Sequence, residues 1–196
     1  MKTDFENIKV QIENGVAVLT MDNPPVNQLS EHFALQLIQA VSEGFQDSNI
    51  KAIVLTGTGK NFVAGADLTQ IYKIYDKERI RTRSKGFADF LNQIEIGPKP
   101  VIAAINGNAL GGGLELAMAC HYRISTKGAQ HGQPEVMVGL IPGAGGTQRL
   151  PRLIGLPNSL EMITVGKPID AEKALSRRLV DEVTDPEKFG AFQWKP

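Results

Sequence analysis

The 196-residue sequence lacks the features that mark several large classes of protein. Its single cysteine, Cys120, allows no internal disulfide, and the apolar surroundings LAMAC favour a small core residue over a nucleophile. Basic and acidic residues number 21 each, so no overall field attracts nucleic acid or an anionic membrane. No apolar run approaches the roughly 20 residues of a membrane span, and the polar N-terminus is not a signal peptide. We therefore expect a cytoplasmic protein with no nucleic-acid or membrane partner.

Signals for metal and nucleotide sites are also missing. The three histidines, His32, His121 and His131, have no paired spacing, so each is predicted to be a surface or packing residue and no metal site is expected. The segment GTGK (57–60) lacks the four-residue spacing and the Ser or Thr of a phosphate-binding P-loop. The sequence therefore indicates neither a metal site nor a phosphate-binding P-loop.

The length and the apolar pattern predict one α/β domain. Residues 8–12 and 16–20 alternate around Asn14-Gly15, which predicts a hairpin, and Ser30 is a good cap for the amphipathic helix that follows. Short apolar runs predict three buried parallel strands at 52–57, 100–106 and 121–126. Helices are predicted for the segment from Lys77 to Ile94, for LELAMAC, and for three segments after residue 145.

A glycine-bearing loop is predicted after each of the three parallel strands: GTGKNFVAGAD, NGNALGGG and GQPEVMVGLIPGAGG. Ligands collect beyond the carboxyl ends of parallel strands, so neighbouring strands would bring these loops together. Glycine allows close backbone approach, and the free amides at a helix start suit an oxyanion. The loops therefore predict an anion or carbonyl site. From the glycines alone, tight strand-to-helix turns are an equal alternative.

Two glutamates stand in apolar surroundings close to these loops. Glu115 lies one turn into the predicted apolar helix, and Glu135 lies in PEVMVGL. A buried carboxylate without a partner costs several kcal/mol or takes up a proton, so the pair is a candidate general acid and base. The alternative is that each carboxylate is neutralised by an arginine such as Arg123, Arg149 or Arg152.

Three motifs in the same order resemble the crotonase superfamily, which contains the enoyl-CoA hydratases and isomerases. They are KNFVAGADL (60–68), AINGNALGGGLELAMAC (104–120) and GQPEVMVGLIPGAGGTQRLPRLIG (132–155), and the resemblance extends from about Ile8 to about Val183. It implies a ββα superhelical spiral fold with a core domain at 1–183. Residues 184–196 are then expected to be a short tail in place of the family's longer helical segment, which covers the acyl pocket and helps to build trimers.

The resemblance also implies roles for individual residues. The amides of Ala66 and Gly112 would form an oxyanion hole, and Glu115 and Glu135 match the two glutamates of the hydratases. The remaining contacts to coenzyme A are then expected from Lys60, Ala64, Ala66, Asp67, Gly111 and Gly112. The expected reaction is syn addition of water to a 2-enoyl-CoA in fatty-acid β-oxidation. No separate cofactor is expected, because coenzyme A is part of the substrate.

Several alternatives stay open at this point. They are another reaction of the family (isomerisation, dehydration or thioester hydrolysis), a weak acyl-CoA-binding fragment, and a piece of a bifunctional enzyme, which PPVNQLS also resembles. His121 and His131 stand where the family more often has an aspartate and an aromatic residue, so packing or polarity is expected to differ there. The resemblance implies a homo-oligomer, either a trimer or a dimer of trimers.

Overall fold

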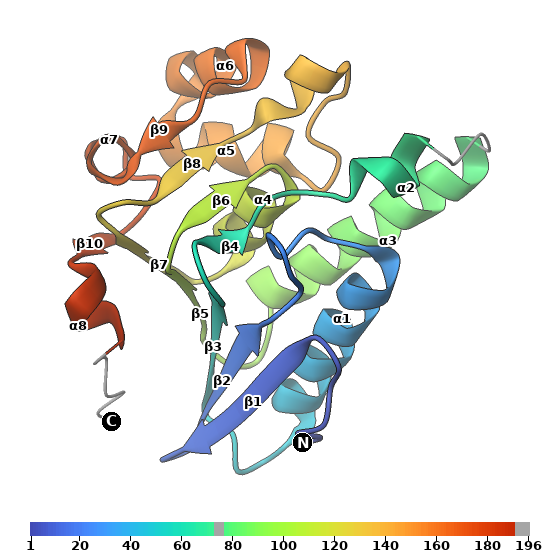
Figure 1. Cartoon of the computed structure of the whole chain (residues 1–196), viewed down its shortest axis with the longest axis vertical. Coiled ribbons are helices and arrows are strands. Elements are labelled where there is room, and N and C mark those ends of the chain that lie inside the picture. Colours follow the sequence, from blue (N-terminus) through green and yellow to red (C-terminus); the bar gives the residue numbers. More distant parts are fainter. Residues whose placement is uncertain (73–76, 191–196) are drawn as a thin grey trace.

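Two β-sheets with helices packed around them form the framework of the computed structural model, which describes residues 1–72 and 77–190 (Figure 1). The six-stranded sheet has the order β1-β2-β3-β5-β7-β10 and the four-stranded sheet the order β4-β6-β8-β9. The larger sheet contains β1 (Ile8–Glu13), β2 (Val16–Met21), β3 (Ala52–Gly57), β5 (Val101–Ile105), β7 (Tyr122–Thr126) and β10 (Glu182–Thr184). The smaller sheet contains β4 (Asn61–Val63), β6 (Asn108–Leu110), β8 (Gln130–Gly132) and β9 (Ile169–Asp170).

The N-terminal hairpin follows from its turn residues. Strands β1 and β2 pair antiparallel, and Asn14 (φ 50°) and Gly15 (φ 80°) both adopt the left-handed conformation that a two-residue hairpin turn needs. On β2, Ala17, Leu19 and Met21 alternate with half-buried residues and face the core. The predicted hairpin is confirmed.

The three predicted parallel strands are neighbours in the larger sheet. β3 pairs with β5 and β5 pairs with β7, all in parallel. All of their residues except Tyr122 are buried or half-buried, as expected for strands covered on both faces. The adjacency on which the predicted convergence of the loops depends is therefore present.

The second sheet is a correction to the sequence prediction. Segments 57–67, 106–113 and 132–146 were expected to be loops that follow the strands directly, but β4 and β6 lie within the first two and β8 ends at Gly132, where the third begins. β4 pairs with β6 and β6 with β8, in parallel. Strands of three residues are too short to show an alternating pattern, so no local signal indicated them. Each turn of the spiral thus consists of one strand from the larger sheet, one strand from the smaller sheet and then a helix. This is the ββα arrangement that the resemblance implies.

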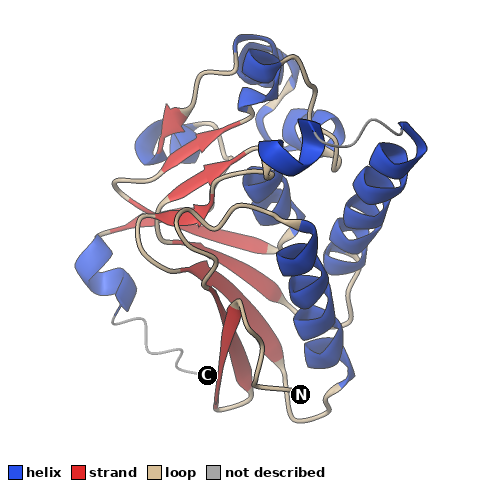
Figure 2. Cartoon of the chain, turned by 45° about the vertical axis from the view of Figure 1, so that its right-hand side comes forward, coloured by secondary structure: helices blue, strands red, loops and turns tan. Residues whose placement is uncertain are grey.

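Helices cover the framework and one helix lies within it. The long helices α1 (Glu31–Gln46) and α3 (Lys77–Glu95) lie on the same side of the larger sheet (Figure 2). Ser30 accepts a hydrogen bond from the Phe33 amide and caps α1, as predicted. Every residue of α4 (Gly112–Ala119) after the first is buried, which explains its apolar composition. The other helical segments are α2 (Leu68–Tyr72), the 3₁₀ helix η1 (Pro134–Val138), α5 (Gly146–Ile154), α6 (Leu156–Val165), α7 (Ala171–Ser176) and α8 (Pro186–Gly190).

The expected tail at 184–196 begins within regular structure. Thr184 is the last residue of β10, and α8 follows it. Residues 191–196 lie outside the described residues, so the expected boundary at 183 stays a prediction for them.

The predicted packing roles of Cys120 and the histidines are confirmed. Burial raises the pKa of the Cys120 thiol to about 12, so this residue is an inert part of the core. His131 is fully buried and lies 3.1 Å from Ser125 Oγ, which links β8 to β7. Burial lowers the pKa of His131 to about 4, so its ring is neutral at physiological pH. His32 and His121 lie at the surface.

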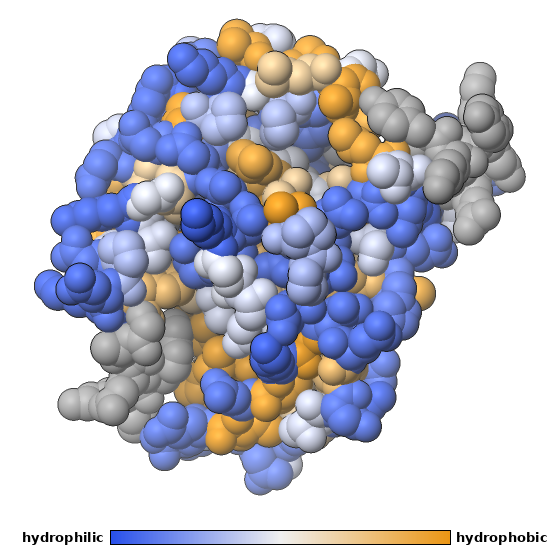
Figure 3. Space-filling view, viewed as in Figure 1, coloured by the Kyte–Doolittle hydropathy of each residue, from blue (hydrophilic) through white to orange (hydrophobic). Residues whose placement is uncertain are grey.

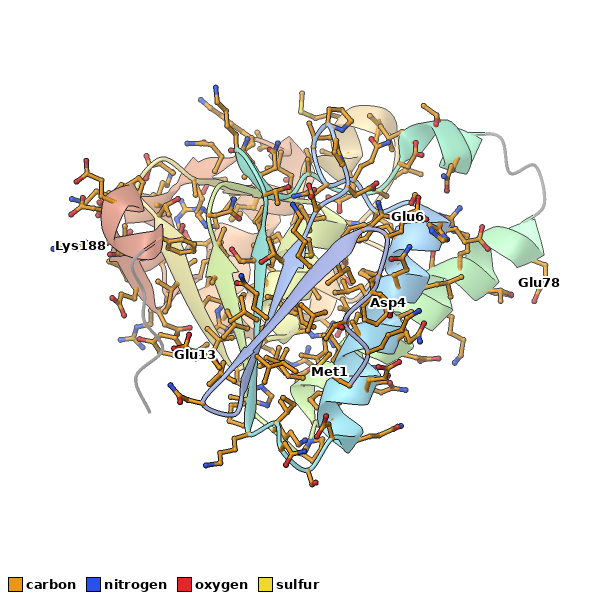
Figure 4. All side chains as sticks on the ribbon, turned by 60° about the horizontal axis from the view of Figure 1, so that its bottom comes forward. Met1, Asp4, Glu6, Glu13, Glu78 and Lys188 are labelled. Carbon is orange, nitrogen blue, oxygen red and sulfur yellow. The ribbon has the colours of Figure 1, made fainter. Side chains whose placement is uncertain are left out.

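Apart from a few buried ones such as Glu115 and Arg149, charged side chains lie around the outside of the molecule. Figure 4 shows Glu78 at one end and Lys188 at the other, both pointing away from the sheets. Within the described residues, no helix combines the length and the hydropathy that crossing a bilayer would require.

The packing of α4 against β4 leaves no room for a side chain at Gly113. A Cβ on Gly113 would overlap the carbonyl oxygen of Val63, which belongs to a strand and cannot easily move. Gly113→Ala should therefore lower the free energy of unfolding by about 1–3 kcal/mol or more in a denaturant titration. The control is Gly128→Ala, because nothing lies within 4 Å of a Cβ there. Equal stability of the two variants would contradict this packing.

Candidate active site

The candidate site lies where three strands of the smaller sheet end. Ala64–Asp67 follow β4, Gly111 and Gly112 follow β6, and Glu135 follows β8 by three residues. Because these strands are parallel neighbours, their carboxyl ends meet at one edge of the sheet. The sequence prediction placed the site directly beyond the carboxyl ends of the strands of the larger sheet. The short strands β4, β6 and β8 instead place the loops at the edge of the smaller sheet.

The loop from Ala64 to Asp67 is fixed by the segment before α1. The Leu29 amide donates to the Gly65 carbonyl (2.8 Å), and the Asp67 amide donates to the Leu29 carbonyl (3.3 Å). Between these two bonds, the Ala66 amide has no acceptor within the described residues, and Ala66 is exposed. The predicted oxyanion donor is therefore a free N–H on a fixed loop.

The second free amide belongs to Gly112. It is the first residue of α4, so its N–H precedes the intrahelical hydrogen bonds, and it has no acceptor within the described residues. Gly111 before it adopts φ 53° and ψ −126°, which a residue with a side chain would rarely adopt. A Cβ on Gly111 would lie 3.6 Å from Gly65 Cα, so the two loops lie side by side. Two free amides on adjacent loops are suited to bind one oxyanion.

Glu115 is buried, and the third glycine-rich loop holds it. Only 2% of the residue is exposed, and its Oε1 accepts hydrogen bonds from the amides of Ala144 (2.8 Å) and Gly146 (2.7 Å). Gly146 starts α5, so the carboxylate lies at the positive end of that helix. The predicted anion site of the PGAGG loop is therefore occupied by a side chain of the protein itself.

The protonation of Glu115 depends on opposing effects. Burial raises the pKa of this carboxyl, while the amides of Gly146 and Ala144 and the charge of Arg149 lower it. None of the three arginines considered in the sequence forms an ion pair with it: Arg123 pairs with Asp181, Arg149 with Glu95, and Arg152 donates to the Gln148 carbonyl. Backbone amides therefore bind Glu115, and the alternative of a paired arginine is not what the structure shows.

Glu135 is held much less firmly. Its Oε2 is buried and accepts no hydrogen bond within the described residues, while Oε1 would lie 3.2 Å from a Cβ on Gly111. Burial, with a smaller contribution from the charge of Glu115, raises the pKa of Glu135 to about 7. Near neutral pH this carboxyl therefore carries a proton about half of the time. The two glutamates lie in different environments, which is the arrangement expected of an acid and a base.

The other predicted contact residues surround the first loop. Lys60 is exposed just before β4, and Ala64 is half-buried. Asp67 is only 7% exposed, and its carboxylate accepts hydrogen bonds from the amide and the hydroxyl of Thr69 at the start of α2. The side chain of Asp67 is thus used to hold the loop.

Sequence reasoning missed Gln133. It is fully buried, its Nε2 donates to the Gly111 carbonyl (3.2 Å), and its Oε1 has no partner within the described residues. That oxygen would lie 2.7 Å from a Cβ on Gly146, between the second and the third loop. A buried amide directly before PEVMV was the only signal in the sequence, and it resembles any core polar residue.

The described residues contain no group of three His, Cys, Asp or Glu side chains arranged to hold a metal ion. The polar groups at the site are backbone amides, one amide side chain and two carboxylates. This set can polarise a carbonyl group and transfer protons.

Comparison with solved structures identifies the class of this fold. The chain superimposes on an enoyl-CoA hydratase from Bacillus anthracis with a TM-score of 0.89 and 37% identity, over 95% of this chain and 73% of that one. An enoyl-CoA hydratase from Geobacillus kaustophilus gives a TM-score of 0.93 at 30% identity, over 96% and 72%. The fold is therefore crotonase-like, as the sequence predicted.

Comparison with sequences identifies the family. The family model for enoyl-CoA hydratase/isomerase matches residues 11–191, and a probable enoyl-CoA hydratase from Bacillus subtilis (strain 168) is 43% identical over 88% of this chain and 67% of that protein. The chain belongs to the enoyl-CoA hydratase/isomerase family.

Some relatives are much longer. A glyoxysomal fatty acid beta-oxidation multifunctional protein from Brassica napus is 48% identical over 92% of this chain, and the match covers only 26% of that protein. The chain thus spans about a quarter of the length of this relative.

The raised pKa of Glu135 predicts a dependence of stability on pH. Between the unfolded value of about 4.5 and the folded value of about 7, the native state binds more protons than the unfolded state. Stability should therefore fall as the pH rises through this window, by about 2 kcal/mol after allowance for the part of the carboxyl that water reaches.

Denaturant titrations of wild type and Glu135→Gln between pH 5 and 8 measure this effect. The difference in unfolding free energy between them should grow with pH in favour of the variant, whereas Glu13→Gln at an exposed strand end should follow wild type. A constant difference across the window would show that Glu135 titrates normally.

Proposed function

We propose that this chain is an enoyl-CoA hydratase, adding water in syn geometry across the 2,3 double bond of a 2-enoyl-CoA thioester. The observation that carries the proposal is the position of two free amides, Ala66 and Gly112, beside two carboxyls in different hydrogen-bonding environments. The names of the hydratase relatives support it.

The oxyanion hole is the first part of the proposed mechanism. Attack of water at C3 moves negative charge onto the thioester oxygen as an enolate forms. The N–H groups of Ala66 and Gly112 donate to that oxygen, and because their loops are already fixed they need no reorganisation during the reaction. A side chain on either Gly111 or Gly112 would occupy the space that the thioester needs.

The two glutamates then divide the proton transfers. Glu115 is the general base: its Oε1 is held by two amides, which leaves Oε2 to accept a proton from the attacking water. Glu135 is the proton donor to C2, because burial without a hydrogen-bond partner for Oε2 favours its neutral form. Water loses one proton to Glu115 and adds as hydroxide at C3, and the proton from Glu135 completes the saturated product.

The coenzyme A portion is proposed to lie along the first loop. The backbone of Ala64, Ala66 and Asp67 borders the adenine and pantetheine, Lys60 lies near the phosphates, and Gly111 and Gly112 border the thioester. The exposed position of Lys60 suits a contact with a solvated phosphate.

Isomerisation of the double bond is the second candidate within the family. An isomerase needs one carboxylate to move a proton between carbons, whereas hydration needs both a base for water and an acid for carbon. The presence of both Glu115 and Glu135 at the site favours hydration.

A homo-oligomer and a cytoplasmic location are part of the proposal. Large apolar side chains are exposed on η1, on the segment after it and on α6, and apolar surface gathers over this upper part of the molecule (Figure 3). They include Val136, Met137, Ile141, Leu156 and Leu160. Sedimentation equilibrium would give a single monomer mass if this surface binds no second copy.

Glu135→Gln should lower kcat by about two to four orders of magnitude, because a positioned proton donor contributes that much. The variant should also lose the fall in kcat/KM that wild type shows as the pH rises through about 7, where Glu135 loses its proton. The measurement is the loss of crotonyl-CoA absorbance at several pH values. Coenzyme A affinity, measured by calorimetry, serves as the control and should be nearly unchanged. Hydration at the wild-type rate would refute the assignment.

Gly112→Val should impair both acyl-CoA binding and turnover, because the added side chain meets Leu29 at 3.0 Å and blocks the approach to the amides. Gly128→Val, where a Cβ meets nothing within 4 Å, is the matched control. Calorimetry with crotonyl-CoA distinguishes them, and tight binding by a folded Gly112→Val protein would exclude the oxyanion hole.

A further inference from the structure

We infer that Arg149 is a positioning residue that fixes the Ala144–Gly146 loop from the side of α3 and thereby holds Glu115 in one orientation. The inference rests on the proposed role of Glu115, and it concerns a residue that touches neither the substrate nor the oxyanion loops.

Arg149 uses its whole guanidinium group, and it is only 7% exposed. Nε donates to Glu95 Oε2 (3.0 Å), and Nη2 donates to Asn92 Oδ1 (2.7 Å) and lies 2.9 Å from the same Glu95 oxygen. Both partners lie in the last turn of α3. Nη1 donates to the Ala144 carbonyl (3.0 Å). The guanidinium therefore ties the glycine-rich loop to a long helix.

The loop carries this restraint to Glu115. The residue whose carbonyl Arg149 binds, Ala144, also donates its amide to Glu115 Oε1, and Gly146 donates the second hydrogen bond to the same oxygen. Gly145 between them has φ 99°, and a Cβ there would overlap Arg149 Nη1, so the loop is shaped around the guanidinium. A chain of direct contacts thus runs from Asn92 and Glu95 through Arg149 to the carboxylate.

The loop needs such a restraint because two of its three central residues are glycines. Without it, the backbone could rotate the amides away from Glu115, and the carboxylate would lose the hydrogen bonds that aim Oε2 toward the site. Lysine could replace the charge but not the planar group that binds three partners at once.

Among the residues that the structure describes, few charged groups face Glu115. Glu135 approaches from η1, and Arg149 approaches from α5 together with its partner Glu95 from α3. β4 and β6, which also contact α4, contain no charged residue. Elsewhere on α3, Lys85 pairs with Asp89 and Arg83 with Glu31. The charge of Arg149 lowers the pKa of Glu115, so its removal should raise that pKa.

The experiment compares wild type, Arg149→Met, Arg149→Lys and the control Arg152→Met in the crotonyl-CoA assay. Arg152 lies on the same helix but is exposed and contacts only Gln148 in the described part of the chain. Arg149→Met should lower kcat on the order of 100-fold with KM little changed, because misaligned groups slow the chemical step more than binding. Arg149→Lys should rescue part of the loss, and Arg152→Met should match wild type. Circular dichroism at the assay temperature checks that each variant is folded.

A second readout does not require activity. The carboxyl carbons of ¹³C-labelled glutamate report the titration of Glu115, assigned with Glu115→Gln. In Arg149→Met the pKa of Glu115 should rise above its wild-type value, and in Arg152→Met it should not. Each variant must show native circular dichroism. A rise in the pKa of Glu115 that occurs in Arg149→Met and not in Arg152→Met therefore cannot be attributed to unfolding.

The two readouts separate the possible outcomes. A rise in the pKa of Glu115 with loss of kcat supports both the positioning role and the proposed hydration. The same rise in a chain whose wild type does not hydrate crotonyl-CoA supports the positioning role and refutes the proposed function. An unchanged Glu115 titration and an unchanged kcat in folded Arg149→Met would overturn the inference. If Arg149→Met does not fold, Asn92→Ala removes the hydrogen bond from Arg149 Nη2 to Asn92 Oδ1. An unchanged titration of Glu115 in Asn92→Ala would then overturn the inference.

Discussion

A carboxylate buried at the start of a helix is the constraint around which the site is arranged. Glu115 is nearly inaccessible to water, so its charge must be balanced by the protein. The balance comes from two amides at the N-terminus of α5, at 2.7 and 2.8 Å, and no cation among the described residues pairs with it directly. This choice explains the PGAGG loop, since a Cβ at Gly146 would meet Glu115 Oε1 at 2.9 Å. It also leaves the second carboxylate oxygen available for chemistry.

The rest of the site depends on the smaller sheet. Its three-residue strands place one loop after another along a single edge, so that the free amides of Ala66 and Gly112 and the side chain of Glu135 come from successive turns of the spiral. Glycines are needed where segments of backbone approach one another closely. Gly113 packs against the Val63 carbonyl, and Gly111 takes a backbone conformation that residues with side chains rarely adopt. The triple glycine therefore serves both the packing of α4 and access to its amide end.

Much of this arrangement could be predicted from the sequence. The Asn-Gly hairpin, the Ser30 cap and the three apolar strands each carry a local signal, and all are present. The three motifs were sufficient to identify the family. What could not be predicted depends on contacts between distant segments. The short strands β4, β6 and β8 are stabilised by pairing with one another, and nothing in three residues indicates it. The sequence suggested arginines only as alternative partners of Glu115, because side chains are visible in a sequence, whereas the backbone amides that bind it are not. Gln133 and the contacts of Arg149 with Asn92 and Glu95 were missed for the same reason.

The central claim is that this chain adds water to an enoyl thioester. The most direct measurement is to incubate the purified 196-residue chain with crotonyl-CoA in water enriched in oxygen-18 and to analyse the acyl product by mass spectrometry. The account predicts a hydroxyacyl thioester that carries one heavy oxygen at C3, formed far faster than with Glu115→Gln. If crotonyl-CoA binds but no labelled hydroxyacyl product forms, the account is contradicted. A product that is only a double-bond isomer would contradict it as well.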